Sequence, residues 1–248
     1  MVQRSVLVTG GTGGLGQAVT AAFVADGWRV VVPVRAGSGR PDRRDGRPPG
    51  GPAGPTAGRS ATDGPVVRVT ADLTRPEDVA AAVAVAAGEA DAPLRAVVNL
   101  VGGYAAGGRV HETPVEEFER IVALNLRPTY LVTQQALPHL VAAGGGSVVC
   151  VSSRAAVAPF PGAAGYVTAK AAVLAFASAV AVEYRAAGVR CNTVLPSIID
   201  TPTNRADQPD ADQTRWVPPA EIATVIRFLA GDESAPTSGA AIPVYGRA

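Results

Sequence analysis

A glycine-rich turn near the N-terminus lies between a short apolar run and a helical pattern. Ser5–Thr9 has the length and apolarity of a buried strand, and glycines follow it at positions 10, 11, 13, 14 and 16. Beyond them, Leu15, Val19 and Phe23 recur at helical spacing. In such a strand–turn–helix unit, backbone N–H groups at the helix N-terminus bind a pyrophosphate, although tight turns also use glycine for steric reasons alone. The predicted dinucleotide contacts are Gly10, Thr12, Gly13, Gly14, Leu15 and Gly16.

Strand-like and helical segments alternate along the rest of the chain. The further expected strands are Arg29–Val34, Val66–Thr70, Leu94–Asn99, Ser147–Ser152, Arg190–Leu195 and Ala241–Val244. Helices are expected at Pro76–Ala87, in the alanine-rich run around Tyr166 and at Ala220–Ala230. A further long helix is expected to begin with a Thr113-Pro114-Val115-Glu116 capping box and to run to about Leu140. This alternation predicts an α/β fold: a single doubly wound Rossmann domain, residues 1–248, with a parallel sheet of about seven strands flanked by helices.

Two segments depart from this alternation. Residues 36–65 contain eight glycines and six prolines, so we expect a flexible loop there in place of a helix. Its five arginines could reach an adenosine phosphate, although a flexible insert with no catalytic role is the simpler interpretation. Residues 196–216 are polar and rich in turn-forming residues, which suits a lid over a substrate.

The end of the second expected strand bears on the choice of dinucleotide. An acidic residue there would bond the ribose 2′-hydroxyl and repel a 2′-phosphate. The chain instead has Val34 followed by Arg35, which favours NADP(H) over NAD(H), unless Arg35 only solvates the strand end. After the third strand, Asp72 and Leu73 are placed to meet the adenine.

A second glycine turn, Asn99-Leu100-Val101-Gly102-Gly103, ends the fourth expected strand. Ligands gather at the carboxyl edge of parallel sheets, so Asn99, Val101 and Gly102 are candidate cofactor contacts. In the next helix Asn125 lies among apolar residues and must find polar partners. It is a candidate site residue, with a buried structural amide as the alternative.

Tyr166 and Lys170 stand four residues apart in an alanine-rich run, so both side chains project from one helix face. An ammonium next to a phenol favours the phenolate, which makes Tyr166 a candidate acid or base; two surface residues are the alternative. Lys170 is the only lysine among 22 basic residues, which suggests that arginine would not serve there. Ser153, at the exit of the fifth strand, reaches the same edge of the sheet.

Composition limits the remaining possibilities. A net charge of +1 argues against a nucleic-acid-binding face. We find no apolar run of spanning length and no signal-peptide pattern, and therefore expect a soluble, cytoplasmic protein. Cys150 and Cys191 lie in strand-like runs and are interpreted as buried thiols. With only His111 and His139 as histidines, no metal site is expected.

Together these motifs resemble the short-chain dehydrogenase/reductase family over essentially the whole chain. Thr9–Gly16 corresponds to the family's cofactor motif, and Asn99-Leu100-Val101-Gly102 to its N-N-A-G turn, with two of four positions changed. Tyr166 and Lys170 match the Y-x-x-x-K motif, with Ser153 thirteen residues before the tyrosine. The P-G-x-x-x-T loop matches Pro196–Thr201, with Ser197 in place of glycine.

The resemblance implies hydride transfer between a nicotinamide and a carbonyl or imine carbon of a small molecule, without a metal. Tyr166 would donate the proton, Ser153 would hydrogen-bond the same oxygen, and Lys170 would lower the tyrosine pKa and hold the ribose. Asn125 would position a water, and Pro196, Ile199 and Thr201 would meet the cofactor. A homodimer or homotetramer, formed through the helices carrying Asn125 and Tyr166, is also implied.

Other functions share parts of this pattern. Two stretches, residues 101–108 and 195–216, are similar to dihydropteridine reductase, so quinonoid dihydropterin reduction is an alternative; Ser153 is a departure from the animal pteridine enzymes. A non-catalytic NADP(H)-sensing protein and a nucleotide-sugar epimerase or dehydratase are further alternatives. Tyr104, Phe160, Ile198 and Trp216 could line an apolar substrate pocket or serve only as core or lid packing.

Overall fold

The computed structural model describes residues 4–37, 62–63 and 65–247. One sheet runs through the molecule in the strand order β3-β4-β2-β1-β5-β6-β7-β8. All neighbouring strands are parallel except β3 and β4, which pair antiparallel. The strands are β1 Ser5–Thr9, β2 Arg29–Val34, β3 Thr62–Asp63, β4 Val66–Thr70, β5 Leu94–Asn99, β6 Gly146–Val151, β7 Val189–Pro196 and β8 Ala241–Val244.

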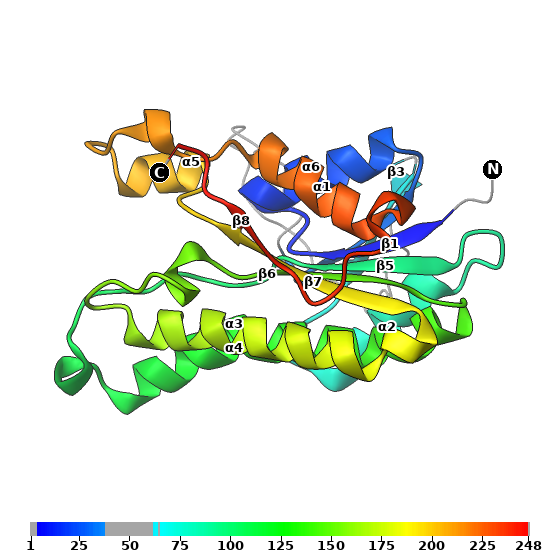
Figure 1. Ribbon diagram of the computed structural model, residues 1–248, viewed down its shortest axis with the longest axis horizontal. Helices are drawn as coiled ribbons and strands as arrows, with labels where there is room; N and C mark the ends of the chain where they lie inside the picture. Colours follow the sequence, from blue (N-terminus) through cyan, green and yellow to red (C-terminus); the bar gives the residue numbers. More distant parts are fainter. Residues whose placement is uncertain (1–3, 38–61, 64, 248) are drawn as a thin grey trace, which may run out of the picture.

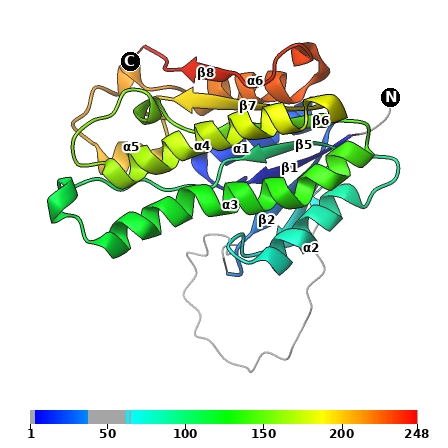
Figure 2. The ribbon, with the colours of Figure 1, turned by 60° about the horizontal axis from the view of Figure 1, so that its bottom comes forward.

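Helices cover both faces of this sheet. Figures 1 and 2 show α1 and α6 on one face and α2, α3 and α4 on the other. The helices are α1 Gly14–Ala25, α2 Pro76–Ala87, α3 Val115–Ala142, α4 Ala164–Glu183, α5 Pro202–Asp207 and α6 Pro219–Ala230. Short 3-10 turns are Val110–Glu112, Arg154–Ala156, Arg185–Ala187, Gln213–Arg215 and Asp232–Ser234. The predicted doubly wound parallel architecture is confirmed.

Successive strand residues supply two separate cores. In β1, Leu7 packs with the α2–α4 layer, whereas Val6 and Val8 pack with α1 and α6. This is the two-residue side-chain alternation of a strand buried on both faces, which explains the continuously apolar runs in the sequence. Because β1 lies between β2 and β5, the strand order reverses there, and a crevice opens at the carboxyl ends of these strands.

Local details differ from the expectations. Thr62–Asp63 pairs with β4, so one part of the expected 36–65 loop is a short strand that makes the sheet eight-stranded; most of that loop lies outside the described residues. The prediction of a capping box at Thr113 is wrong. The helix begins at Val115 after Pro114, and the Thr113 hydroxyl donates to the carbonyls of Gly108 and Arg109 instead.

The most apolar long helix, α4, is long and apolar enough to cross a membrane by length and composition alone. This contradicts the expectation that no run reaches that length. In the structure α4 packs against α3 and β7, and Ala169, Lys170 and Val173 are among its buried residues. Of the stretch that meets this criterion, 33% is buried inside the fold, so packing within the chain accounts for part of the apolarity of α4.

Candidate active site

The first glycine turn forms an open cradle at the N-terminus of α1. Gly10 has φ +66°, the left-handed region that favours glycine. A Cβ on Gly16 would lie 2.0 Å from the Gly10 carbonyl oxygen, so the turn can close this tightly only without a side chain there. Gly13 precedes the helix, no side chain caps it, and no acidic residue lies in the first turn. Unpaired N–H groups at a helix N-terminus without nearby carboxylates fit a cofactor diphosphate.

The loop after β7 closes the other side of this cradle. A Cβ on Gly14 would lie 2.7 Å from the Thr201 Cγ2 atom, so these two segments touch. The Thr201 hydroxyl caps α5 by accepting from the Asn204 N–H at 3.2 Å. The Asn204 amide in turn donates to the Ile199 carbonyl at 2.8 Å. These bonds fix Ile199 and Thr201 within one loop, and Thr201 touches the start of α1.

Arg35 and Asp72 lie at the ends of neighbouring strands β2 and β4, as expected. Arg35 is exposed. The Asp72 carboxylate accepts from the N–H and hydroxyl groups of Thr74, which lower its pKa most, with Arg35 contributing less. Leu73 is buried in the α2–α4 core, so its side chain is a packing residue.

The second glycine turn is anchored by Asn125. Its Oδ1 accepts from the Gly103 N–H at 3.2 Å, and its Nδ2 donates to the carbonyls of Gly103 and Ile121, each at 2.9 Å. A Cβ on Gly102 would lie 2.5 Å from the Asn125 Oδ1 and 3.1 Å from the Lys170 Nζ. The asparagine side chain is therefore fully engaged with backbone groups and fixes the turn directly over Lys170.

Asn99 ends β5 and leads into the second glycine turn, as expected, but its side chain points to α3. Its amide is buried, and Nδ2 donates to the Thr133 hydroxyl at 3.0 Å. The Oδ1 atom is buried and has no hydrogen-bond partner among the described residues. Asn99 thus links β5 to α3, and only its backbone and the following Val101 and Gly102 remain candidates for contact with a cofactor.

Lys170 is a buried cation on α4. Only 6% of it is exposed, and Nζ donates to the Val151 carbonyl at 3.2 Å. The Ser152 hydroxyl donates to the Lys170 carbonyl at 2.7 Å, which ties the helix to the end of β6. Burial lowers the pKa of Lys170 to about 8. Ser152 was missed from the sequence because serine at a strand exit has no distinctive signature.

Tyr166 and Ser153 meet in one cavity at the carboxyl edge of the sheet. Burial raises the pKa of the Tyr166 phenol, and a hydrogen bond with Ser153 lowers it only in part. The Lys170 Nζ lies 5.8 Å from the centroid of the Tyr166 ring. The expected lowering of the tyrosine pKa is therefore wrong for the chain as it stands, because burial of the phenol has the largest effect and raises the pKa. At neutral pH Tyr166 is a protonated phenol.

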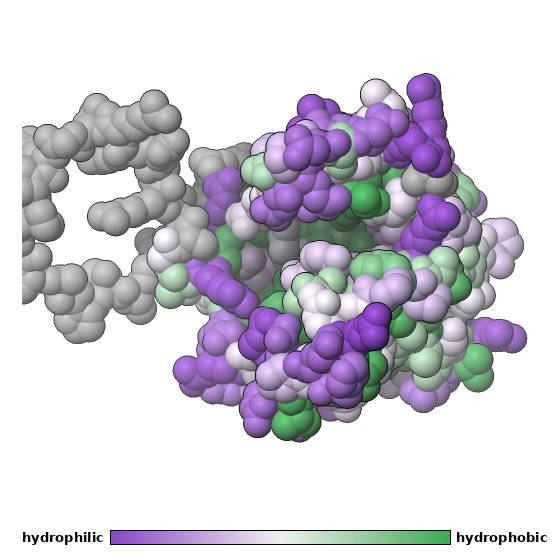
Figure 3. Space-filling model, turned by 90° about the vertical axis from the view of Figure 1, so that its left-hand side faces the viewer, coloured by the Kyte–Doolittle hydropathy of each residue, from purple (hydrophilic) through white to green (hydrophobic). Residues whose placement is uncertain are grey.

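This cavity has a volume of about 590 Å³ and lies in the hollow that Figure 3 shows on this side of the molecule. Tyr104, Phe160 and Ile198 line it, as expected. Trp216 does not; it is buried, with 7% of its surface exposed. Arg154, Asn204 and Gln208 also line the cavity and were not predicted. Their contribution depends on how loops far apart in sequence meet, which spacing alone does not encode.

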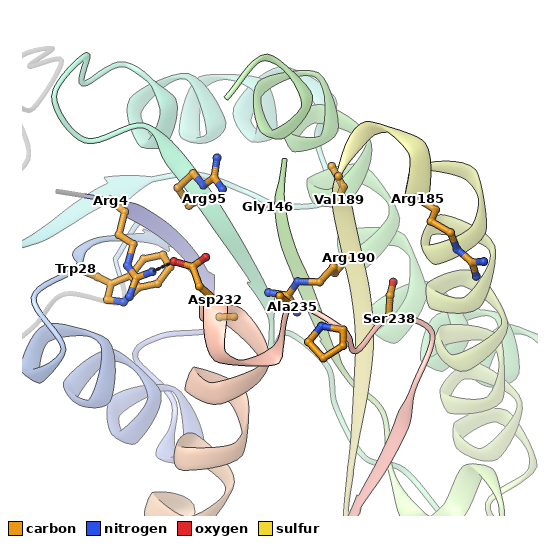
Figure 4. A pocket seen from close by; sticks show the side chains of 13 residues that line it. Arg4, Trp28, Arg95, Gly146, Arg185, Val189, Arg190, Asp232, Ala235 and Ser238 are labelled. Atoms are coloured by element: carbon orange, nitrogen blue, oxygen red, sulfur yellow. Dashed lines mark hydrogen bonds and ion pairs between the residues drawn. The ribbon is translucent and has the colours of Figure 1, made fainter. Parts of the chain in front are cut away.

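A second cavity, of about 630 Å³, lies at the opposite edge of the sheet and is lined by four arginines (Figure 4). Arg4 stacks on Trp28, 4.1 Å from the ring centroid, and binds Asp232. The Arg190 guanidinium donates to the carbonyls of Leu229 and Gly231. The Arg4 and Arg190 guanidinium groups are committed to internal contacts, and the described residues that line this cavity include no phenol or ammonium group.

Among the described residues, no group of three or more His, Cys, Asp or Glu side chains is arranged to hold a metal ion. Cys150 and Cys191 are free and buried. The groups gathered at the carboxyl edge are therefore a phenol, a hydroxyl, an ammonium and a glycine cradle.

Known proteins are similar in sequence to this chain over nearly its whole length. A family model described as "Enoyl-(Acyl carrier protein) reductase" matches residues 10–246. The chain is 35% identical to 2-(R)-hydroxypropyl-CoM dehydrogenase of Xanthobacter autotrophicus, over 99% of this chain and 98% of that protein.

Solved structures agree in fold. A short-chain type dehydrogenase/reductase from Mycobacterium ulcerans superposes with a TM-score of 0.83 at 27% identity, covering 98% of this chain and 89% of that one. A 3-ketoacyl-(acyl-carrier-protein) reductase from Brucella melitensis, complexed with NADH, gives 0.78 at 26% identity and covers 98% of each chain. With the glycine cradle and the Ser153–Tyr166–Lys170 cluster in place, the chain belongs to the short-chain dehydrogenase/reductase family and is a nicotinamide-dependent oxidoreductase acting on hydroxyl or carbonyl groups.

Proposed function

We propose that this protein is an NADP(H)-dependent oxidoreductase that transfers a hydride between the nicotinamide and a carbonyl group of a small molecule. The observation that carries the proposal is that Ser153 and Tyr166 line one cavity of about 590 Å³ at the sheet edge that also holds the glycine cradle. NADP(H) is favoured over NAD(H) because Arg35, with no carboxylate beside it in sequence, follows β2.

The bound nicotinamide would supply or accept the hydride at its C4 atom. Tyr166 carries its proton at neutral pH, since burial raises its pKa, and would give it to the developing alkoxide oxygen. Ser153 would hydrogen-bond the same oxygen and stabilise its charge. Lys170 would hold the ribose with its ammonium. Asn125 acts through the Gly102–Gly103 turn, which it fixes against Lys170.

The remaining cofactor contacts follow from position along the cradle and its rim. The diphosphate would be held by backbone groups of the cradle, at Gly10, Thr12, Gly13, Gly14, Leu15 and Gly16. Asp72 and the backbone beside Leu73 would contact the adenine. The backbone after Asn99, at Val101 and Gly102, would contact the ribose. Pro196, Ile199 and Thr201 would meet the nicotinamide and phosphates. We further propose a cytoplasmic homodimer or homotetramer in which residues 1–248 form one domain and residues 196–216 a lid.

Replacement of the phenol tests the proposal most directly. Tyr166→Phe should reduce kcat by at least about 100-fold, the usual contribution of a positioned proton donor, with the Kd for NADPH changed by less than about threefold. Kd is measured by NADPH fluorescence and kcat by NADPH oxidation against ketones, aldehydes, quinones and imines. Full activity of this variant would contradict proton donation by Tyr166. NADPH binding without any turnover by the wild type would favour a non-catalytic NADP(H)-sensing protein.

Quinonoid dihydropterin reduction is the second candidate. The rings of Tyr104 and Phe160 border the cavity with centroids 6.5 Å apart and planes 35° apart, a setting that suits a flat heterocycle. Including quinonoid dihydropterin in the substrate panel separates the two candidates: a kcat/KM above that for simple aldehydes would select it.

A further inference from the structure

Among the described residues that line the candidate substrate cavity, Arg154 has the only charged side chain. It directly follows Ser153 and begins the turn Arg154–Ala156, in which the Ser153 hydroxyl accepts from the Ala155 N–H at 3.1 Å. The proton-handling end of the cavity and this guanidinium are therefore adjacent along the chain. A cation and the groups for carbonyl chemistry share one pocket here.

Arg154 has no charge partner among the described residues. It makes none of the ion pairs or side-chain hydrogen bonds of the described chain; its contact is with the ring of Tyr245, whose centroid lies 5.1 Å from its Cζ. Arg205, on the neighbouring α5, instead binds Asp200 through two nitrogens. A guanidinium left with its donors unused beside a largely apolar cavity attracts an oxyanion, which it can bind bidentately.

Tyr245 and Ser197 fix the position of the Arg154 guanidinium. Ser197 lines the same cavity, and its hydroxyl donates to the Tyr245 carbonyl at 2.8 Å. This bond holds the Tyr245 backbone against the loop after β7, so that its ring supports the Arg154 guanidinium from one side. A stacked arginine keeps the edges of its planar fork available for a ligand.

We propose that Arg154 binds an anionic group of the substrate, so that the physiological substrates are carbonyl compounds, or the corresponding alcohols, that carry a carboxylate, phosphate or sulfonate. The inference rests on the proposed hydride transfer and adds the substrate class to it. The same oxygen chemistry also occurs in the phosphates of the cofactor, so the test must separate the two sources.

Matched aldehydes isolate the charge. We compare 3- and 4-formylbenzoate with 3- and 4-formylbenzamide, which have the same shape, for the wild type, Arg154→Gln and the control Arg205→Gln. The wild type should prefer the benzoates, and Arg154→Gln should lower kcat/KM for them by about 10- to 100-fold, mainly through KM. Its activity on the benzamides and its Kd for NADPH should stay within about threefold, and Arg205→Gln should behave as the wild type.

Other outcomes overturn the inference. Equal use of acid and amide by the wild type, or an equal loss on both in Arg154→Gln, would exclude an anion-binding role for Arg154. A weakened Kd for NADPH in this variant would assign the guanidinium to the cofactor. Should the wild type reduce neither aldehyde, calorimetric titration with benzoate and benzamide decides: saturable benzoate binding lost in Arg154→Gln supports the inference even where the proposed hydride transfer fails, and its absence overturns it.

Discussion

Lys170 is the residue at which stability and chemistry oppose each other. It is 6% exposed, and its ammonium donates to the Val151 carbonyl. Burial of a cation with so few partners disfavours the charged form, which is why the pKa of Lys170 falls to about 8. Near neutral pH the side chain nevertheless stays charged, as the proposed contact with a ribose requires. Under the proposed function, the loss of stability from burying this cation is offset by its role at the cofactor.

Lys170→Met should therefore stabilise the fold while removing turnover. The gain in free energy of unfolding at pH 7 should be on the order of 1–3 kcal/mol, because a pKa lowered by one on folding corresponds to about 1.4 kcal/mol and the lost bond to Val151 offsets part of the gain. The folded pKa of about 8 lies below the usual 10.5, so the native state releases the proton first. Between these values the unfolded chain binds more protons, and wild-type stability rises with pH.

Urea unfolding of both proteins at pH 7 and about pH 9.5 checks this sign. The advantage of the methionine variant should shrink at the higher pH, because only the wild type gains from deprotonation. A gap that stays constant or widens between the two pH values would show that the charge of Lys170 is not the cause.

Spacing in the sequence predicted which residues meet, but not their ionisation. The four-residue step from Tyr166 to Lys170 places both on one helix face, and the structure has both within α4. The direction of the tyrosine pKa depends on burial of the ring, to which Tyr104 also contributes, and residue spacing contains no information on that burial. For the same reason the sequence left open whether Trp216 lines the pocket or packs in the core, and in the structure it is buried and does not line the cavity.

At the scale of elements, arginines at the start of strands hydrogen-bond the carbonyl groups at the C-terminal ends of neighbouring helices. Arg29 of β2 donates to the carbonyls of Val85 and Ala86 at the end of α2. Arg95 of β5 donates to the Ala143 carbonyl after α3, and Arg190 of β7 to Leu229 and Gly231 at the end of α6. A cation at a helix C-terminus also interacts favourably with the helix dipole.

Alternating apolar segments made the strands and helices predictable, whereas these caps were not. Each one joins residues far apart in the chain, and an arginine before an apolar run looks the same whether it meets a helix or solvent. The short helix α5 was likewise missed within the polar segment 196–216, because it begins with a Thr201 cap and runs for only six residues.

Arg190→Met should destabilise the protein by about 2–4 kcal/mol, because the carbonyls of Leu229 and Gly231 and the Ser234 hydroxyl lose their shared donor in a half-buried setting. Arg185→Met is the matched control, since Arg185 lines the same cavity, is exposed and points away from Arg190 in Figure 4. The control should change the free energy of unfolding by less than about 0.5 kcal/mol. Equal effects in urea unfolding would refute the capping argument.

On the scale of the whole molecule, the candidate catalytic groups and the arginine caps lie at opposite edges of the sheet. The carboxyl edge holds the glycine cradle, Ser153 and Tyr166, while the opposite edge holds the arginine caps. Substitutions at the capping edge can therefore alter stability without touching the candidate chemistry.

Helices α3 and α4 lie side by side in Figure 2, and several of their large apolar residues are exposed. They include Tyr130, 46% exposed and packed on Phe176, and Val182, 68% exposed. Exposed aliphatic and aromatic residues on neighbouring helices are typical of a subunit interface. We expect the proposed homodimer or homotetramer to form through this layer.

Tyr130→Asp should lower the oligomeric state, because a carboxylate inserted between apolar helix faces would lose its hydration without gaining a partner. Phe228→Asp on α6, where the phenylalanine is 40% exposed on the opposite layer, is the control and should leave assembly through α3 and α4 intact. Light scattering after gel filtration measures the mass of each variant. Dissociation by Phe228→Asp with retention by Tyr130→Asp would move the interface to the α6 layer, and a monomeric wild type would show that these apolar residues serve another purpose.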